Sequence, residues 1–169
     1  ETLWRLLRRY HIPTFVFINK MDLPGLGKDA LLDQLNHRLG EGFVDFGAEE
    51  AARNDALALC DERLMDAVLE NGTLTDADII PAIARRHVFP CWFGAALKLD
   101  GVDEFLAGLD RYTREAPALE AFGAKVFKIS QDEQGARLTW LRVTGGVLKV
   151  KAQLTGEADG EPWAEKANQ

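Results

Sequence analysis

The chain contains the sequence Thr14-Phe15-Val16-Phe17-Ile18-Asn19-Lys20-Met21-Asp22, and its fold class can be inferred from these nine residues. Five apolar or β-favouring residues lead directly into Asn-Lys-x-Asp. A short apolar run of this kind is typical of a buried strand in a parallel sheet. Ligands of open α/β sheets bind outside the carboxyl ends of the strands. The polar residues after the strand are therefore predicted to face a ligand.

The three polar side chains suit a guanine base. The carboxylate of Asp22 can accept hydrogen bonds from guanine N1–H and N2–H₂, whereas adenine has no N1–H donor. The amide of Asn19 can bond the base and the neighbouring loop, and the apolar stem of Lys20 can lie along a base face while its ammonium stays in water. The alternative interpretation is a strand followed by an ordinary polar turn. The residue types favour guanine recognition.

A second strand, loop and helix follow later in the chain. Residues 88–93 form an apolar run, 94–98 read Gly-Ala-Ala-Leu-Lys, and 102–112 have helical spacing of apolar residues. Small residues in the loop would let the backbone approach a ligand closely. If the two strands are parallel neighbours, both loops surround one base.

The first ten residues predict a helix that packs on the sheet. Its apolar positions are Leu3, Leu6, Leu7 and Tyr10, and its arginines are Arg5, Arg8 and Arg9. We interpret the arginines as a solvated helix face, with a contact to a partner as the alternative.

The remaining segments predict a helical insert and a second, all-β region. Between the two strands, the sequence predicts helices over 30–39 and 48–70, a brief extended piece at 43–46, and a helix that begins near 76–78. After residue 117, it predicts strands at 125–129, 138–143 and 147–150, a loop over 154–160, and a possible strand over 163–168.

Composition limits the possible functions. The 169 residues carry a net charge of −7, so the chain as a whole has no basic footprint for nucleic acid. It has no apolar run of transmembrane length and no signal peptide. No phosphate-binding loop is present, because the glycine expected five residues before Gly27 is Asp22, and Asp29 follows Lys28 where Ser or Thr would be needed.

Five acidic residues could be imagined as a metal site, but we interpret them as helix caps and solvated helix faces, and predict no metal ligands. They are Asp61, Glu62, Asp66, Asp76 and Asp78.

Four segments together resemble translational GTPases of the elongation factor G class, and are most similar to tetracycline-resistance ribosomal protection proteins. They are Phe-Ile-Asn-Lys-Met-Asp at 17–22, Gly-Ala-Ala-Leu-Lys at 94–98, Lys-Val-Phe-Lys-Ile at 125–129 and Arg-Leu-Thr-Trp-Leu-Arg-Val-Thr-Gly-Gly-Val-Leu at 137–148. The resemblance implies an α/β fold: the C-terminal half of a P-loop GTPase sheet with a helical insert at about 29–87, within residues 1–116. The start of a β-barrel domain would follow in 117–169, and the chain would be a piece of a longer protein.

The resemblance also implies roles for five residues. Asn19 and Asp22 would bind guanine, Lys20 would lie over the ring, and Ala96 would donate its backbone N–H to guanine O6. Ala95 stands where the family usually has Ser, whose hydroxyl braces the Asn-Lys-x-Asp loop. Losing one such hydrogen bond costs about 1 kcal/mol of loop order.

The implied parent protein hydrolyses GTP on the ribosome in the cytoplasm, binds GTP or GDP with Mg²⁺, and in the protection class helps to displace tetracycline. No catalytic residue and no Mg²⁺ ligand is expected in this segment, so the segment alone should not hydrolyse GTP. Its unpaired strand edges could cause non-native self-association. The alternatives are elongation factor G, a release-factor GTPase, or a non-enzymatic interaction module that retains this architecture.

Overall fold

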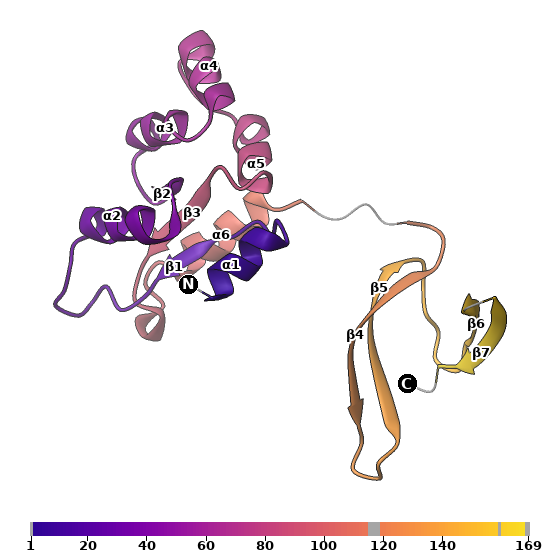
Figure 1. The fold of residues 1–169 in the computed structure, drawn as a ribbon. Coiled ribbons are helices and arrows are strands. Elements are labelled where there is room, and N and C mark those ends of the chain that lie inside the picture. Colours follow the sequence, from indigo (N-terminus) through magenta and orange to yellow (C-terminus); the bar gives the residue numbers. More distant parts are fainter. Residues whose placement is uncertain (1, 115–118, 159, 168–169) are drawn as a thin grey trace. The chain divides into compact units, whose positions relative to one another are not determined.

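The chain divides into two compact units, Glu1–Arg114 and Glu115–Gln169 (Figure 1). The computed structural model describes residues 2–114, 119–158 and 160–167. The predicted domain boundary at 116/117 lies outside the described residues.

The first unit is built on a three-stranded parallel sheet in the order β1-β3-β2. Strand β1 (Val16–Ile18) pairs with β3 (Phe89–Phe93), and β3 pairs on its other side with β2 (Phe43–Asp45). The two strands that precede the loops are parallel neighbours, which is the condition for both loops to lie at one site. The extended piece expected at 43–46 is a full member of the sheet, which means that the insert contributes a strand as well as helices.

The helices of the first unit differ from the prediction at one place. They are α1 (Thr2–Arg9), α2 (Lys28–Leu39), α3 (Glu50–Ala58), α4 (Glu62–Asn71), α5 (Asp76–Ala84) and α6 (Val102–Tyr112), with a short 3₁₀ turn η1 at Ala96–Lys98. The single helix predicted over 48–70 is wrong. The carboxylate of Asp61 accepts a hydrogen bond from the Arg63 N–H at 2.9 Å and begins a new helix. A strong N-cap therefore interrupts a continuous apolar stripe.

No helix in the described part of the chain is long and apolar enough to cross a membrane.

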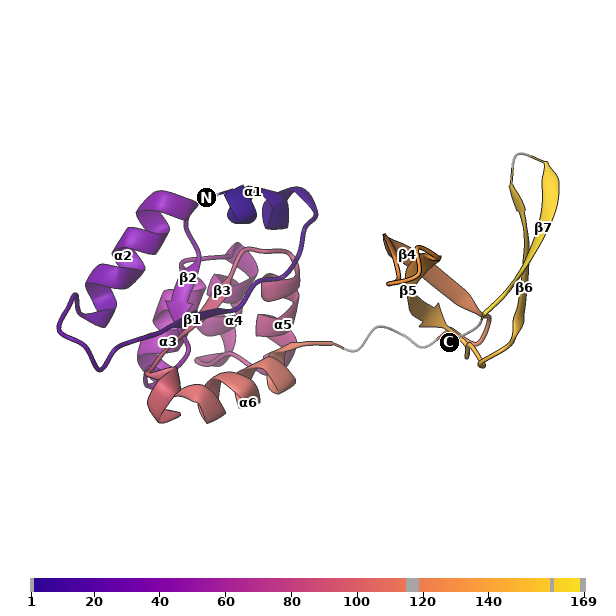
Figure 2. The same cartoon turned by 90° about the horizontal axis from the view of Figure 1, so that it is seen from below.

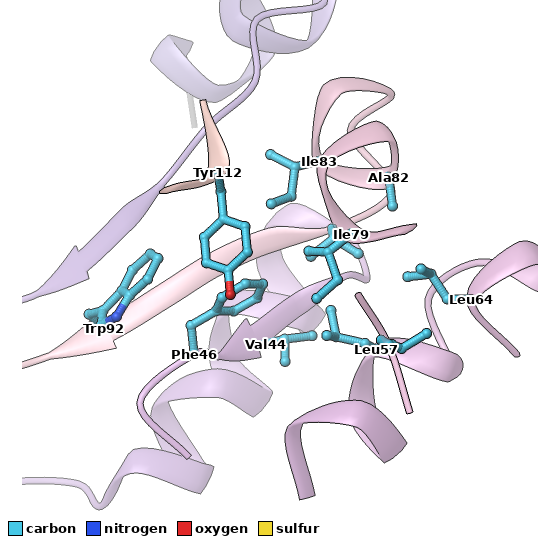
Figure 3. Packing of buried hydrophobic residues seen from close by; sticks show 11 residues of the cluster. Val44, Phe46, Leu57, Leu64, Ile79, Ala82, Ile83, Trp92 and Tyr112 are labelled. Carbon is cyan, nitrogen blue, oxygen red and sulfur yellow. The ribbon is translucent and has the colours of Figure 1, made fainter. Parts of the chain in front are cut away.

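Helices cover both faces of the sheet (Figure 2). On one face, Phe43, Phe89 and Cys91 pack with Trp4 of α1 and three leucines of α2. On the other face, the larger core joins the sheet to α3, α4, α5 and α6 (Figure 3). Its buried members are Val44, Phe46, Leu57, Leu64, Leu74, Ile79, Ala82, Ile83, Val88, Trp92 and Tyr112. Successive strand residues alternate between the two cores, as the period of a strand requires.

Helix α1 packs through a different side from the one predicted. Leu3, Leu6 and Tyr10 are exposed, whereas Trp4 and Leu7 are half-buried. The Trp4 ring lies 5.2 Å from the Phe43 ring, and its indole N–H donates to the Leu39 carbonyl at 2.7 Å. Hydrophobic spacing alone favoured the leucines, but the indole gains both an aromatic contact and a hydrogen bond.

Helix α6 approaches the sheet closely at Gly108. A Cβ added there would lie 2.1 Å from Cζ2 and 2.6 Å from Cη2 of the buried Trp92. The missing side chain therefore makes room for the indole.

We expect Gly108→Ala to destabilise the protein by about 1–2 kcal/mol, because overpacking outweighs the gain in helix propensity. Urea unfolding measures this. At an open helical site the same substitution is stabilising by roughly 0.5–1 kcal/mol, so increased stability would show that Trp92 does not fill this space.

In the second unit, the described residues form two antiparallel hairpins. Strand β4 (Gly123–Gln131) pairs with β5 (Arg137–Gly145), and β6 (Gln153–Ala158) pairs with β7 (Glu161–Lys166). The strand predicted at 147–150 is wrong, because the chain turns at Gly146, whose N–H donates to the Leu119 carbonyl at 2.7 Å.

The loop predicted over 154–160 is also wrong, because β6 occupies most of it. Residue 168 of the possible strand over 163–168 lies outside the described residues, and β7 accounts for 163–166. The α/β region followed by antiparallel strands confirms the predicted fold class. Self-association of the chain stays a prediction.

Candidate functional site

Strand β1 ends in a tight turn that presents Asn19, Lys20 and Asp22. Lys20 has φ +65°, a left-handed conformation that a non-glycine residue rarely adopts. Its N–H donates to Asn19 Oδ1 at 2.8 Å, and its carbonyl accepts from the Leu23 N–H at 3.2 Å. Asn19, Lys20 and Asp22 are all exposed. The turn therefore directs the three side chains away from the core.

Strand β3 is followed by a second loop, whose two ends are joined by backbone hydrogen bonds. The Ala95 N–H donates to the Asp100 carbonyl at 3.0 Å, and the Asp100 N–H returns a longer bond of 3.3 Å to the Ala95 carbonyl. Leu99 has φ +60° and Gly101 has φ +73°. These bonds form a short loop whose centre is η1.

Three hydrogen bonds tie the two loops together. Gly94 N–H donates to the Ile18 carbonyl and Met21 N–H donates to the Gly94 carbonyl, both at 3.0 Å. The third is from the Ala96 N–H to Asn19 Oδ1 at 2.9 Å. Asn19 Oδ1 thus accepts from two backbone N–H groups, which only the oxygen of the amide can do. The amide nitrogen of Asn19 makes no hydrogen bond within the described residues.

An ion pair adds a fourth connection. Lys98 Nζ lies 2.8 Å from Asp22 Oδ2, and the Asp22 side chain is 28% exposed. The hydrogen bond from Lys98 has the largest effect and lowers the pKa of Asp22. Desolvation opposes it, and the charge of Lys98 adds a further lowering effect. Asp22 is therefore held ionised and oriented.

The structure brings all five predicted site residues, Asn19, Lys20, Asp22, Ala95 and Ala96, to the same edge of the sheet. Ala95 is only 2% exposed, so its side chain cannot contact a ligand.

Two further residues belong to the same surface and were not predicted. Lys98 pairs with Asp22, and Leu97 is 99% exposed. Both lie in the Gly-Ala-Ala-Leu-Lys segment, so the signal that could have found them was their place in the predicted second loop. Their orientation depends on η1, which the sequence did not predict.

A parallel α/β sheet with two linked loops at the carboxyl ends of adjacent strands fits the class of P-loop GTPase-like domains. Residues 1–115 match the family model described as the elongation factor Tu GTP-binding domain. The chain belongs to this family, the GTP-binding domain of translational GTPases.

A solved structure supports the fold. The chain is similar to the crystal structure of ttk003000868 from Thermus thermophilus, with a TM-score of 0.65 and 20% sequence identity. The match covers 90% of this chain and 30% of that one. The chain thus spans about 30% of the length of the solved chain that it matches.

Proposed function

We propose that this chain is the guanine-recognition segment of a ribosome-dependent translational GTPase, and specifically of a tetracycline-resistance ribosomal protection protein acting in the cytoplasm. The match to the elongation factor Tu GTP-binding domain supports the assignment to translational GTPases. The observation that carries the proposal is the linkage of Asn19 and Asp22 to the loop of Ala96 and Lys98. The protection-protein assignment rests on the resemblance of the four sequence segments.

Asp22 is the residue that distinguishes guanine from other bases in this proposal. A carboxylate has two oxygens and about four acceptor sites. It can receive N1–H and N2–H₂ of guanine while one oxygen keeps its bond to Lys98. Adenine would place its N1 acceptor against the carboxylate, so the hydrogen bonds that guanine makes there could not form.

Asn19 and Ala96 are proposed to bind the acceptor atoms of the base, including guanine O6. The free amide nitrogen of Asn19 can donate to an acceptor of guanine. The Ala96 N–H is already engaged by Asn19 Oδ1, so donation to guanine O6 requires a shared, three-centre hydrogen bond or a small rotation of Asn19. Three-centre bonds of backbone N–H groups are common at helix termini, and Ala96 begins η1.

Two side chains can cover the faces of the base. The stem of Lys20 is apolar and exposed, and Leu97 is almost completely exposed beside the same loops. Apolar surface as large as a leucine side chain is worth about 1.5–3 kcal/mol when buried. Contact with a base would recover part of this free energy.

The bound nucleotide would be GTP or GDP, with Mg²⁺ in the parent protein. Its phosphoryl transfer requires a phosphate cradle and metal ligands. The sequence contains no Gly-x4-Gly-Lys-Ser/Thr pattern that would form such a cradle. We therefore assign base recognition to this chain and the chemical step to other parts of the parent.

Calorimetric titration with GDP and ATP tests the proposal. We expect binding of GDP and no detectable binding of ATP, because only guanine satisfies Asp22. A parallel GTP turnover assay of the purified chain with Mg²⁺ should show no hydrolysis. Equal affinity for the two nucleotides would contradict guanine recognition, and robust metal-dependent hydrolysis would contradict the division of roles.

The ion pair of Lys98 with Asp22 predicts a pH effect. Lys98 lowers the pKa of Asp22, so Lys98→Met should raise it. Guanine binding needs the carboxylate and is lost as pH falls through this pKa. The loss should therefore occur at a higher pH in Lys98→Met than in the wild type.

GDP titrations across acidic pH measure the midpoint pH of this loss of binding, with Lys149→Met in the other unit as the control. Coinciding midpoints would show that Lys98 does not act on Asp22.

A further inference from the structure

The N-terminal part of the chain concentrates positive charge. Between Thr2 and Met21 there are four residues with full positive charges and no acidic residue, although the whole chain has a net charge of −7. They are Arg5, Arg8, Arg9 and Lys20. Such segregation on an acidic protein indicates a local surface for an anionic partner.

Part of this charge lines a cleft between α1 and the turn after α5. The cleft has a volume of about 360 Å³. Its charged and titratable lining residues are Arg8, His11, Arg85, Arg86 and Glu41, and Trp4, Leu39, Gly40 and Phe89 complete it. We call it the basic cleft. Four of these side chains are basic and one is a carboxylate. Arg85 also forms an ion pair with Asp61, which lies outside the cleft, at 3.0 Å.

Arg86 is fixed in the basic cleft before any ligand binds. Its backbone has φ +64°, and its guanidinium donates to the Ile12 carbonyl and, at 2.8 Å, to Thr14 Oγ1. The guanidinium carbon lies 4.8 Å from the Trp4 ring centre and 4.9 Å from that of Phe89. These contacts hold a charge in place, so little side-chain entropy remains to be lost on binding.

Arg85 is paired with Asp61, whereas Arg8 and Arg86 of the basic cleft form no ion pair within the described residues. Burial, and then the charge of Arg8, lower the pKa of Arg86. Within the described residues, Arg8 and Arg9 form no ion pair. Like charges held close together favour an anion between them. A guanidinium presents its donors as a planar fork that matches a phosphate.

An aromatic side chain beside the arginines indicates which polyanion fits. Tyr10 is 65% exposed at the end of α1, and the Arg9 guanidinium lies 5.9 Å from its ring centre. Exposed aromatic rings among basic groups bind single-stranded or looped RNA, because bases stack on them. An acidic polypeptide would use the arginines but not the ring.

We propose that the basic cleft and the adjoining face of Arg9 and Tyr10 bind the phosphate backbone of RNA. The inference rests on the proposed function, because a GTPase that acts on the ribosome contacts ribosomal RNA. It places an RNA contact on the helix before β1, away from the nucleotide loops.

Fluorescence anisotropy with a short labelled hairpin RNA tests this inference at several KCl concentrations. The variant is Arg8→Gln with Arg9→Gln, two exposed positions whose replacement leaves the core intact. The control is Arg63→Gln, an exposed arginine of α4. A polyglutamate competitor separates RNA binding from general anion binding, and GDP titration of the same samples monitors the nucleotide loops.

We expect the wild type and Arg63→Gln to bind the RNA with the same salt dependence. In the double variant, the negative slope of log K against log[KCl] should become shallower by roughly 1 to 2, because each lost phosphate contact removes about 0.7 from its magnitude for single strands. Affinity at low salt should fall by roughly tenfold or more.

Unchanged RNA affinity in the double variant would overturn the inference. Complete competition by polyglutamate at equal charge concentration would also overturn it and would indicate an acidic protein partner. Failure of GDP binding with RNA binding intact would contradict the proposed function instead, so the two failures are distinguishable.

Discussion

Asp22→Asn is expected to exchange the base preference of the protein from guanine to xanthine. In guanine, N1–H and N2–H₂ both donate, and the carboxylate of Asp22 accepts from both. In xanthine, the C2 substituent is a carbonyl oxygen. An asparagine can accept from N1–H and donate to this oxygen, whereas a carboxylate would face it with two acceptors.

The expected loss of GDP affinity in Asp22→Asn is roughly 10- to 100-fold, because a hydrogen bond to a charged group contributes about 1.5–3 kcal/mol. Affinity for xanthosine diphosphate should rise at the same time. Calorimetry with both nucleotides measures the exchange. Asp33→Asn, on the exposed side of α2, makes the same chemical change elsewhere and should alter neither affinity. An equal loss for both nucleotides would mean that Asp22 supports the loop but does not contact the base.

Gly94→Ala is expected to disrupt the candidate site and to destabilise the first unit. A Cβ at this position would lie 2.1 Å from the Asp100 carbonyl oxygen and 2.8 Å from Cζ of Phe17. The oxygen cannot give way easily, because it accepts the Ala95 N–H and closes the second loop. Either the loop moves away from β1, or the strand ends separate.

We expect Gly94→Ala to cost about 1–3 kcal/mol of unfolding free energy, as overpacked sites do, and to weaken GDP binding at least roughly tenfold. Thermal unfolding and calorimetry on the same sample measure both effects. The control is Gly25→Ala in the neighbouring loop, where the nearest atom to the added Cβ is 4.0 Å away. Wild-type stability together with wild-type GDP affinity would show that the close approach at Gly94 is not needed.

The sequence predicted the part of the fold in which chemistry and periodicity agree. The strand before Asn19 and the strand before Gly94 were visible as apolar runs, and the structure shows that they pair in parallel. The wrong predictions depended on single residues. Asp61 divides one apolar stripe into two helices, and Gly146 turns the chain where Val147 favoured a strand. Periodicity cannot show such local hydrogen bonds.

The candidate site shows the same limit. The residue types of Asn19 and Asp22 indicated guanine, but the engagement of Asn19 Oδ1 with the Ala96 N–H and the pairing of Lys98 with Asp22 depend on the distance between two loops. That distance follows from strand register and from the close contact at Gly94, which are tertiary features. The charge pattern of α1 was visible in the sequence, whereas the fixed position of Arg86 was not.

The most direct test of guanine recognition is the backbone amide resonance of Ala96 in a two-dimensional ¹⁵N NMR titration with GDP and, separately, ADP. This N–H lies at the centre of the two linked loops, 2.9 Å from Asn19 Oδ1. We predict that its resonance shifts with increasing GDP, together with that of Lys20, and stays unchanged with ADP. Equal shifts with both nucleotides, or none with GDP while distant residues respond, would contradict a guanine site at these loops.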